Sequence, residues 1–141
     1  MDKKDLHTIL YISTMKIDYS NDSIKKLLEI FTSNNKKNNI SGLMLYYERN
    51  IIQCIEGSKE DVYRLYNNVE NDQRHFNIIK VIDEQISKRN FINWDLAFKE
   101  ISYDEFQKFS LTKLTKFISN NNNNKKILIF FKQFLESFYS Y

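Results

Sequence analysis

The sequence predicts an α+β domain in which one β-sheet carries two helices on the same face. Two observations lead to this prediction. Short runs of β-branched and aromatic residues recur between residues 6 and 100, and two segments between them place apolar side chains at intervals of three and four. With 141 residues, 42% of them hydrophobic and 15% aromatic, the chain is long enough for one domain with a sizeable core.

The first strand is expected over Leu6 to Met15, which is a largely apolar run. A helix follows, and Ser20 and Asp22 are its candidate N-caps. The apolar stripe of this helix has the i, i+3, i+4, i+7 spacing of one helix face and consists of Ile24, Leu27, Leu28 and Phe31. The polar cluster 36–39 (Lys-Lys-Asn-Asn) is expected to end the helix.

The next two strands, 40–47 and 51–56, are expected to form a hairpin around a three-residue turn at 48–50. Ser58 is the expected cap of a second helix, whose apolar stripe is Val62, Leu65, Tyr66 and Val69. After a turn at 72–75, strands at 76–86 and 93–100 complete the order β-α-β-β-α-β with one extra strand. This order is the ferredoxin-like pattern.

The predicted strands are apolar on both faces, so the sheet face opposite the two helices also needs a cover. Residues 101–141 are expected to supply it as a C-terminal helical cap on the domain 1–100. One helix would carry Phe106, Phe109, Leu114 and Phe117, and after the asparagine run 120–124 a last helix would carry Ile127, Leu128, Phe131, Phe134, Leu135 and Phe138. Ile129 and Phe130 remain outside that stripe, which indicates either a thick core or an oligomer or partner contact.

Composition excludes several classes of function. No apolar run reaches the ~20 residues of a membrane span, and the single Cys54 suits a reducing compartment, so a cytoplasmic protein is expected. The net charge of +3 is slight and does not indicate nucleic-acid binding. Two glycines and no proline exclude a Gly-rich phosphate loop, and two His with one Cys leave no zinc cluster. Hydrolytic or metal-dependent catalysis, and hence an enzyme, is not expected.

Gln53 is the most informative residue, because it stands where a strand buried in the core should carry an apolar side chain. Along a strand, alternate residues share a face, so Gln53 lies with Ile51 and Ile55. A buried amide without a partner costs roughly 1–3 kcal/mol. Gln53 must therefore be held by protein groups or face a polar ligand.

Two further polar residues are expected near Gln53. Asn35 continues the buried stripe of the first helix, four residues after Phe31, and Tyr11 shares a strand face with Ser13. Between that helix and the sheet, Tyr11, Asn35 and Gln53 would offer a phenol and two carboxamides, which suit the edge of a planar heterocycle. The alternatives are that Tyr11 packs in the core with its hydroxyl at the surface and that Asn35 is a helix C-cap.

At this point the residues resemble a known family, the BLUF domain, a flavin-based sensor of blue light. The resemblance covers residues 6–100, about two-thirds of the chain, and its motifs keep their order and spacing. They are Leu-Tyr-Ile-Ser at 10–13, Asn35 seven residues before Gly42, Ile-Ser-Gly-Leu-Met-Leu-Tyr at 40–46, Ile-Gln-Cys-Ile-Glu-Gly at 52–57, Asp-Gln-Arg-His at 72–75 and Arg-Asn-Phe-Ile-Asn-Trp at 89–94.

The resemblance implies that FAD, or FMN or riboflavin in its place, lies between the two helices. It implies that Tyr11 is the photochemical electron donor, that Gln53 switches its hydrogen bonds between Tyr11 and the flavin, and that Asn35 holds the edge of the flavin ring. Further positions that it places near the flavin are Asn34, Asn68, Asp72 and His75. The output would be a conformational change passed to a separate effector protein, since no cyclase or phosphodiesterase segment is attached.

One departure concerns the signal relay. The family often places Met two residues after the tryptophan of the last strand, and here Trp94 is followed at that position by Leu96. Leucine has no polarizable sulfur, so Trp94 and Leu96 would relay the signal differently. A flavin-binding redox or light-insensitive module of the same fold therefore remains as an alternative. An RNA-binding module is not indicated, because the third strand of this chain lacks the stacking aromatics that such a module needs. An acylphosphatase-like enzyme is not indicated either, because the chain lacks a phosphate-binding loop.

Overall fold

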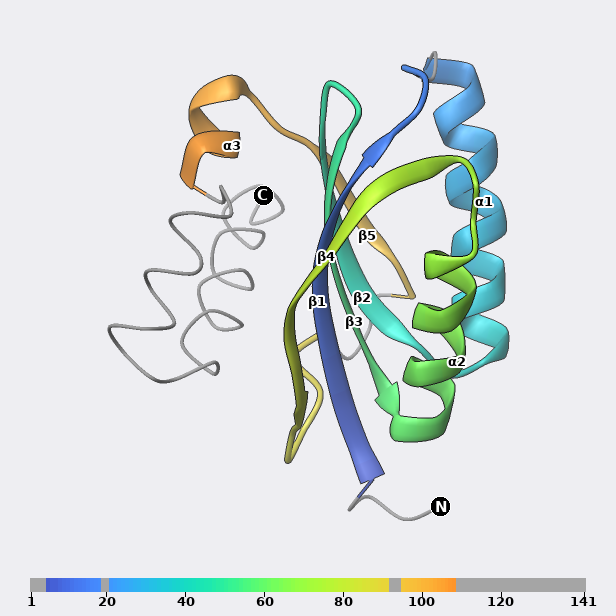
Figure 1. Ribbon diagram of the computed structural model, residues 1–141. Helices are drawn as coiled ribbons and strands as arrows, with labels where there is room; N and C mark the ends of the chain where they lie inside the picture. Colours follow the sequence, from blue (N-terminus) through green and yellow to red (C-terminus); the bar gives the residue numbers. More distant parts are fainter. Residues whose placement is uncertain (1–4, 19–20, 92–94, 109–141) are drawn as a thin grey trace, which may run out of the picture.

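The computed structural model describes residues 5–18, 21–91 and 95–108 (Figure 1). Five strands form one sheet in the order β4-β1-β3-β2-β5. The elements are β1 (Leu6–Met15), α1 (Asn21–Lys37), β2 (Ser41–Tyr47), β3 (Asn50–Ser58), α2 (Lys59–Glu70), β4 (His75–Gln85), β5 (Ala97–Glu100) and α3 (Tyr103–Lys108). In the described part of the chain, no helix is long and apolar enough to cross a membrane.

The arrangement of layers confirms the predicted α+β, ferredoxin-like fold. Helices α1 and α2 cover one face of the sheet, and α3 lies on the opposite side (Figure 1). Strand β1 pairs antiparallel with β3 and β4, β2 pairs antiparallel with β3, and β5 joins the edge parallel to β2. The central strands β1 and β3 therefore carry their side chains directly under the two helices.

Several predicted boundaries are wrong. The hairpin turn has two residues, Glu48 and Arg49, because Asn50 already pairs with Tyr47. Both turn residues have positive φ, 45° and 73°, which is the backbone of the two-residue turns whose twist matches that of paired strands. Strand β5 begins at Ala97 rather than at residue 93, and His75 belongs to β4 rather than to the preceding turn. Asp22 lies inside the first turn of α1 and is not its cap.

The ends of the helices follow the predicted signals. Ser58 caps α2, since its hydroxyl accepts a hydrogen bond from the Asp61 N–H. Helix α1 ends in a Schellman motif: Asn39 has φ 57°, its N–H bonds to Lys36 O, and the Ile40 N–H bonds to Asn35 O at 2.8 Å. This motif fixes the backbone of Asn35 in the last turn of the helix.

The core is divided by the sheet. On the α3 side, Leu10, Leu43, Leu45, Ile52, Cys54, Ile82 and Phe91 form the main apolar cluster. Cys54 thus lies on the face opposite Gln53, as predicted. Phe106 of α3 stacks on Tyr47 with ring centroids 5.0 Å apart. The first part of the segment that was expected to cover this face therefore contacts it. The other expected residues of the C-terminal helices lie outside the described residues.

Candidate functional site

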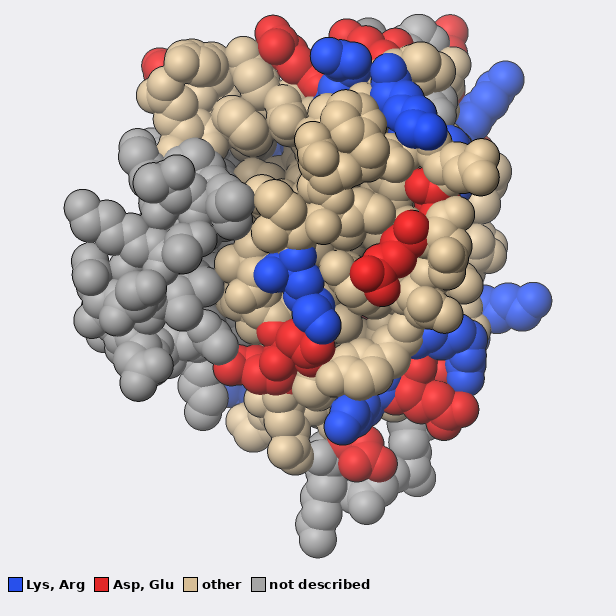
Figure 2. Space-filling model, in the orientation of Figure 1, with Lys and Arg blue, Asp and Glu red and all other residues tan. Residues whose placement is uncertain are grey.

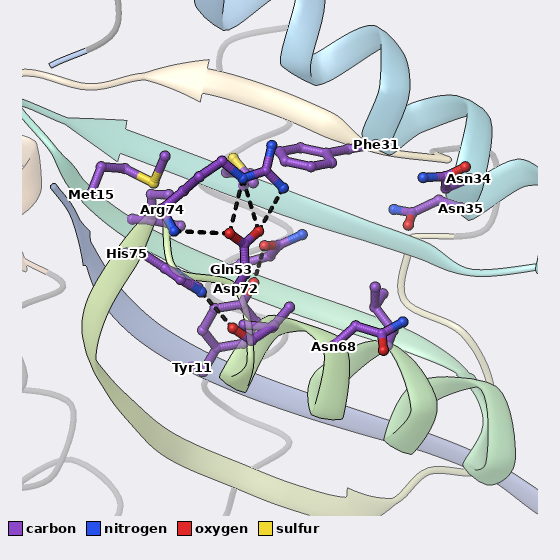
Figure 3. A pocket seen from close by; sticks show the side chains of 14 residues that line it. Tyr11, Met15, Phe31, Asn34, Asn35, Gln53, Asn68, Asp72, Arg74 and His75 are labelled. Carbon is purple, nitrogen blue, oxygen red and sulfur yellow. Dashed lines mark hydrogen bonds and ion pairs between the residues drawn. The ribbon is translucent and has the colours of Figure 1, made fainter. Parts of the chain in front are cut away.

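A cavity of about 200 Å³ lies between the sheet and the two helices (Figure 3). All seven residues expected at a cofactor line it: Tyr11, Asn34, Asn35, Gln53, Asn68, Asp72 and His75. They come from β1, α1, β3, α2, the segment between α2 and β4, and the first residue of β4. Residues up to 64 positions apart in the chain therefore meet at one place, counting from Tyr11 to His75.

Tyr11 and Gln53 are paired neighbours on β1 and β3, and the Tyr11 hydroxyl donates a hydrogen bond to Gln53 Oε1. Both side chains are buried, with 3% and 7% of their surface exposed. The carbonyl end of the amide is thus held by the protein, while its nitrogen end points away from Tyr11 (Figure 3).

Burial raises the pKa of Tyr11 above its ordinary value, and the neighbouring Tyr66 and Asp72 raise it further. The phenol therefore keeps its proton across the physiological pH range. The ring of Tyr66 meets that of Tyr11 edge-on, with centroids 5.5 Å apart. This packing fixes the orientation of the Tyr11 ring.

Asn35 is 3% exposed and donates from Nδ2 to the backbone carbonyl of Asp95 at 2.8 Å. Its side chain is therefore not a C-cap, since the Schellman motif already satisfies the end of α1. The amide lines the cavity and at the same time contacts the segment just before β5. Asn35 joins the cavity to that edge of the sheet.

Arg74 is a lining residue that the sequence reasoning missed. Its Nε donates to both carboxylate oxygens of Asp72, at 2.9 and 3.0 Å, and its guanidinium carbon lies 5.4 Å from the centre of the Phe31 ring (Figure 3). These hydrogen bonds hold the pKa of Asp72 below its ordinary value. Arg74 thus spans from the α2–β4 connection to α1. The sequence did contain a signal for this pair, because Asp72 and Arg74 are only two residues apart and their side chains can therefore meet.

His75 is held at both ring nitrogens, with Nδ1 3.0 Å from Ser13 Oγ and Nε2 2.6 Å from Val69 O. These contacts orient the ring and leave its carbon edge as the part available to a ligand. Asn68 projects from α2 toward the cavity, and Asn34 lies exposed at its rim (Figure 3). The polar groups are therefore distributed around the cavity rather than gathered on one side.

Trp94 and Leu96 are the two residues that were expected to relay the signal. Leu96 is half-buried and packs with the apolar cluster of Met15, Met44, Tyr46 and Ile51 on the cavity side of the sheet. Trp94 lies outside the described residues. Met15 and Met44 line the cavity and were not expected there, because a methionine in a strand looks like any other core residue.

Glu56 is a second residue that sequence reasoning missed. Its carboxylate is fully buried and accepts hydrogen bonds from Ser41 Oγ at 2.9 Å, Asn90 N at 2.9 Å and Phe91 N at 2.5 Å. Arg89 donates to the same Ser41 oxygen at 3.0 Å. Glu56 therefore anchors the chain between β4 and β5 to the centre of the sheet.

Comparison with known proteins decides the family. Residues 6–97 match the family model BLUF, described as sensors of blue-light using FAD. The chain belongs to the BLUF family. BLUF domains bind flavin and sense blue light, so flavin is the ligand class of the domain that residues 6–97 form.

Individual BLUF proteins are similar over this same region. The chain is 27% identical over 86 residues to the Escherichia coli (strain K12) blue light- and temperature-regulated antirepressor BluF, covering 61% of this chain and 21% of that protein. It is 31% identical over 84 residues to the photoactivated adenylate cyclase subunit alpha of Euglena gracilis, covering 60% of this chain and 8% of that protein. The chain thus spans about a fifth or less of these two relatives.

The dark-state structure of the BLUF protein BlrB has the same fold as this chain. The two superpose with a TM-score of 0.72 at 19% identity, covering 94% of this chain and 98% of BlrB. At this identity the likeness supports the fold, and the roles of individual residues have to be argued from their own geometry.

Proposed function

We propose that Tyr11 and Gln53 carry the light reaction of this BLUF domain and that Asn34, Asn35, Asn68, Asp72 and His75 hold the flavin. The observation that carries this proposal is the hydrogen bond from the Tyr11 hydroxyl to Gln53 Oε1 at the wall of the cavity. It leaves the amide nitrogen of Gln53 as the donor that faces a ligand.

The residues present fit a flavin ring. Carboxamides from α1, α2 and β3 supply both donors and acceptors, which match the alternating N–H and C=O groups along the edge of the ring. Apolar side chains such as Phe31, Leu65 and Val69 complete the cavity and suit the flat faces of the ring. The carboxylate of Asp72, ionised because of Arg74, can accept a hydrogen bond from a ring N–H.

The size of the cavity indicates which part of the cofactor it holds. About 200 Å³ is less than the roughly 300–1,000 Å³ of sites that enclose a whole small molecule. We therefore propose that the ring system enters the cavity and that the rest of FAD extends beyond it. Because recognition is concentrated on the ring, FMN and riboflavin should also bind.

When bound, the flavin supplies a ring that absorbs blue light and, once excited, accepts an electron. Tyr11 gives up one electron and, along its hydrogen bond to Gln53, its phenolic proton. Because burial keeps the Tyr11 phenol protonated, its proton would follow the electron. Both return to Tyr11, and no substrate is consumed. The Gln53 amide would then be turned or tautomerised, and a bound flavin would report the changed hydrogen bonding of Gln53 as a shift of its absorption to the red.

We further propose that the output is a conformational change passed to a separate effector protein and that the chain has no enzymatic activity of its own. The curated relatives are named as an antirepressor and as a cyclase subunit, so one light-sensing domain is combined with different outputs. Residues 1–100 would form the flavin-binding domain and 101–141 a helical cap, which the position of α3 on the opposite face supports.

The visible spectrum of the purified protein, before and after blue light, tests the proposal. We expect a flavin spectrum that shifts slightly to the red under blue light and relaxes in darkness. Flavin bound without a shift would favour the alternative of a redox or light-insensitive module. Failure to bind FAD, FMN or riboflavin would contradict the assignment of the cavity.

A further inference from the structure

A row of four side chains crosses the sheet beneath the cavity. Tyr11 of β1 pairs with Gln53 of β3, Gln53 pairs with Met44 of β2, and Met44 pairs with Phe98 of β5. Residues directly opposite each other on paired strands lie on the same face of the sheet. The row therefore begins at the Tyr11–Gln53 hydrogen bond and ends on the edge strand.

Met44 is the member of this row that lies between Gln53 and Phe98. It is 3% exposed, it lines the cavity with Gln53, and Leu96 and Phe98 pack against its cluster. Neighbouring strands lie about 4.8 Å apart, so the backbones of β3 and β5 are separated by about 10 Å. A movement of the Gln53 amide therefore reaches Phe98 through the Met44 side chain that lies between them.

The chemistry of methionine suits this position. Its side chain is unbranched, has three rotatable bonds and carries a polarizable sulfur, so it can follow a neighbouring amide that changes orientation. Leu96, which packs against the same cluster just before β5, offers no sulfur. The thioether between the amide of Gln53 and β5 is thus supplied by β2.

Strand β5 is the part of the sheet best able to respond. It has four residues, and its described pairing is with β2 alone, so few backbone hydrogen bonds hold it. The segment before it is also connected to the cavity, through the bond from Asn35 Nδ2 to Asp95 O. Further upstream, the chain is anchored at Phe91 by Glu56. A change at the cavity would therefore act on the segment between Phe91, which Glu56 anchors, and β5, which lies at the edge of the sheet.

We propose that Met44 is the positioning residue that transmits the rearrangement of Gln53 to β5. This inference rests on the proposed function. Light would alter the amide, Met44 would repack against it, and Phe98 and Leu96 would shift β5 relative to β2.

The test compares Met44→Leu with the control Met15→Leu, which removes the other thioether of the same cavity wall. Leucine nearly conserves the volume of methionine, and such exchanges are among the best tolerated in a core, so both variants should fold and bind flavin. The readouts are the red shift, the light-minus-dark infrared signal of the sheet amide bands, and the rate of dark recovery. For Met44→Leu we expect a normal red shift, a several-fold weaker sheet signal and an altered recovery rate.

Two more variants make the result specific. Phe98→Leu shortens the next member of the row and should weaken the sheet signal in the same way, again with a normal red shift. Combining Met44→Leu with Leu96→Met returns a thioether to this contact from the β5 side and should restore part of the signal. Met15→Leu alters the cavity wall outside the row and should keep the wild-type ratio of sheet signal to red shift.

The outcomes separate the two proposals. Wild-type sheet signals and recovery in both Met44→Leu and Phe98→Leu would overturn the relay and leave the photochemistry intact. An equal loss of signal in Met15→Leu would also overturn it, because any change to the cavity wall would then suffice. Absence of a red shift in the wild-type protein would remove the proposed function, and the relay with it.

Discussion

Replacement of Tyr11 by phenylalanine tests the site at its centre. The change removes one buried hydroxyl, the donor to Gln53 Oε1, and keeps the aromatic ring that packs edge-on against Tyr66. Because no core volume beyond one oxygen is lost, the cavity term is small. The stability cost is that of a buried carbonyl without its donor, about 1–3 kcal/mol. Gln53 lies in a cavity wall and can turn, so we expect about 1–2 kcal/mol.

The effect on the light reaction should be complete. Without a phenol, residue 11 has no proton to give and is far harder to oxidise, so the reversible red shift is lost while flavin remains bound. Chemical denaturation measures the first effect, and difference absorption after blue light measures the second. Tyr66→Phe is the matched control, since this neighbouring tyrosine packs on the same ring; it should keep the shift. A normal shift in Tyr11→Phe would refute the reasoning.

Three other changes give distinct results. Gln53→Leu should bind flavin without a light-induced red shift, because a hydrocarbon cannot exchange hydrogen bonds, and an intact shift in difference spectra would contradict the proposed switch. Burial raises the pKa of Glu56 above its ordinary value, although hydrogen bonds from Asn90, Phe91 and Ser41 oppose this. The stability that its protonated form contributes is therefore fully present below pH ~4.3 and is lost as the pH rises through the raised pKa. As the pH rises through the raised pKa, the free energy of unfolding of the wild type should fall relative to that of Glu56→Gln, which denaturant titrations at several pH values measure. A difference that stays constant with pH would contradict this prediction. Replacing Glu48-Arg49 with Asn-Gly should raise the free energy of unfolding by about 1 kcal/mol, because Asn and Gly adopt positive φ at a lower cost than Glu and Arg. Thermal melting measures this change, and a lower melting temperature would contradict the prediction.

The elements were predictable because each is encoded by neighbouring residues. The stripe from Ile24 to Phe31 and the alternation around Gln53 report periods of 3.6 and 2 residues, which belong to a single helix or strand. The same local logic placed Ser58 at a cap and Cys54 on the face opposite Gln53. The hairpin turn was misjudged because Glu48 and Arg49 are poor indicators of a positive-φ backbone, which the pairing of the two strands imposes.

The residue types that face the space between α1 and the sheet, including the phenol of Tyr11 and the amides of Asn35 and Gln53, followed from the sequence pattern alone. How these side chains are connected depends on the packing of segments that lie far apart in the chain. The Tyr11–Gln53 bond joins residues 42 positions apart, and the Asn35–Asp95 bond joins residues 60 apart. The burial of Glu56 and the row through Met44 depend on strand order and register. Such contacts arise from the packing of distant segments, and no local period records them.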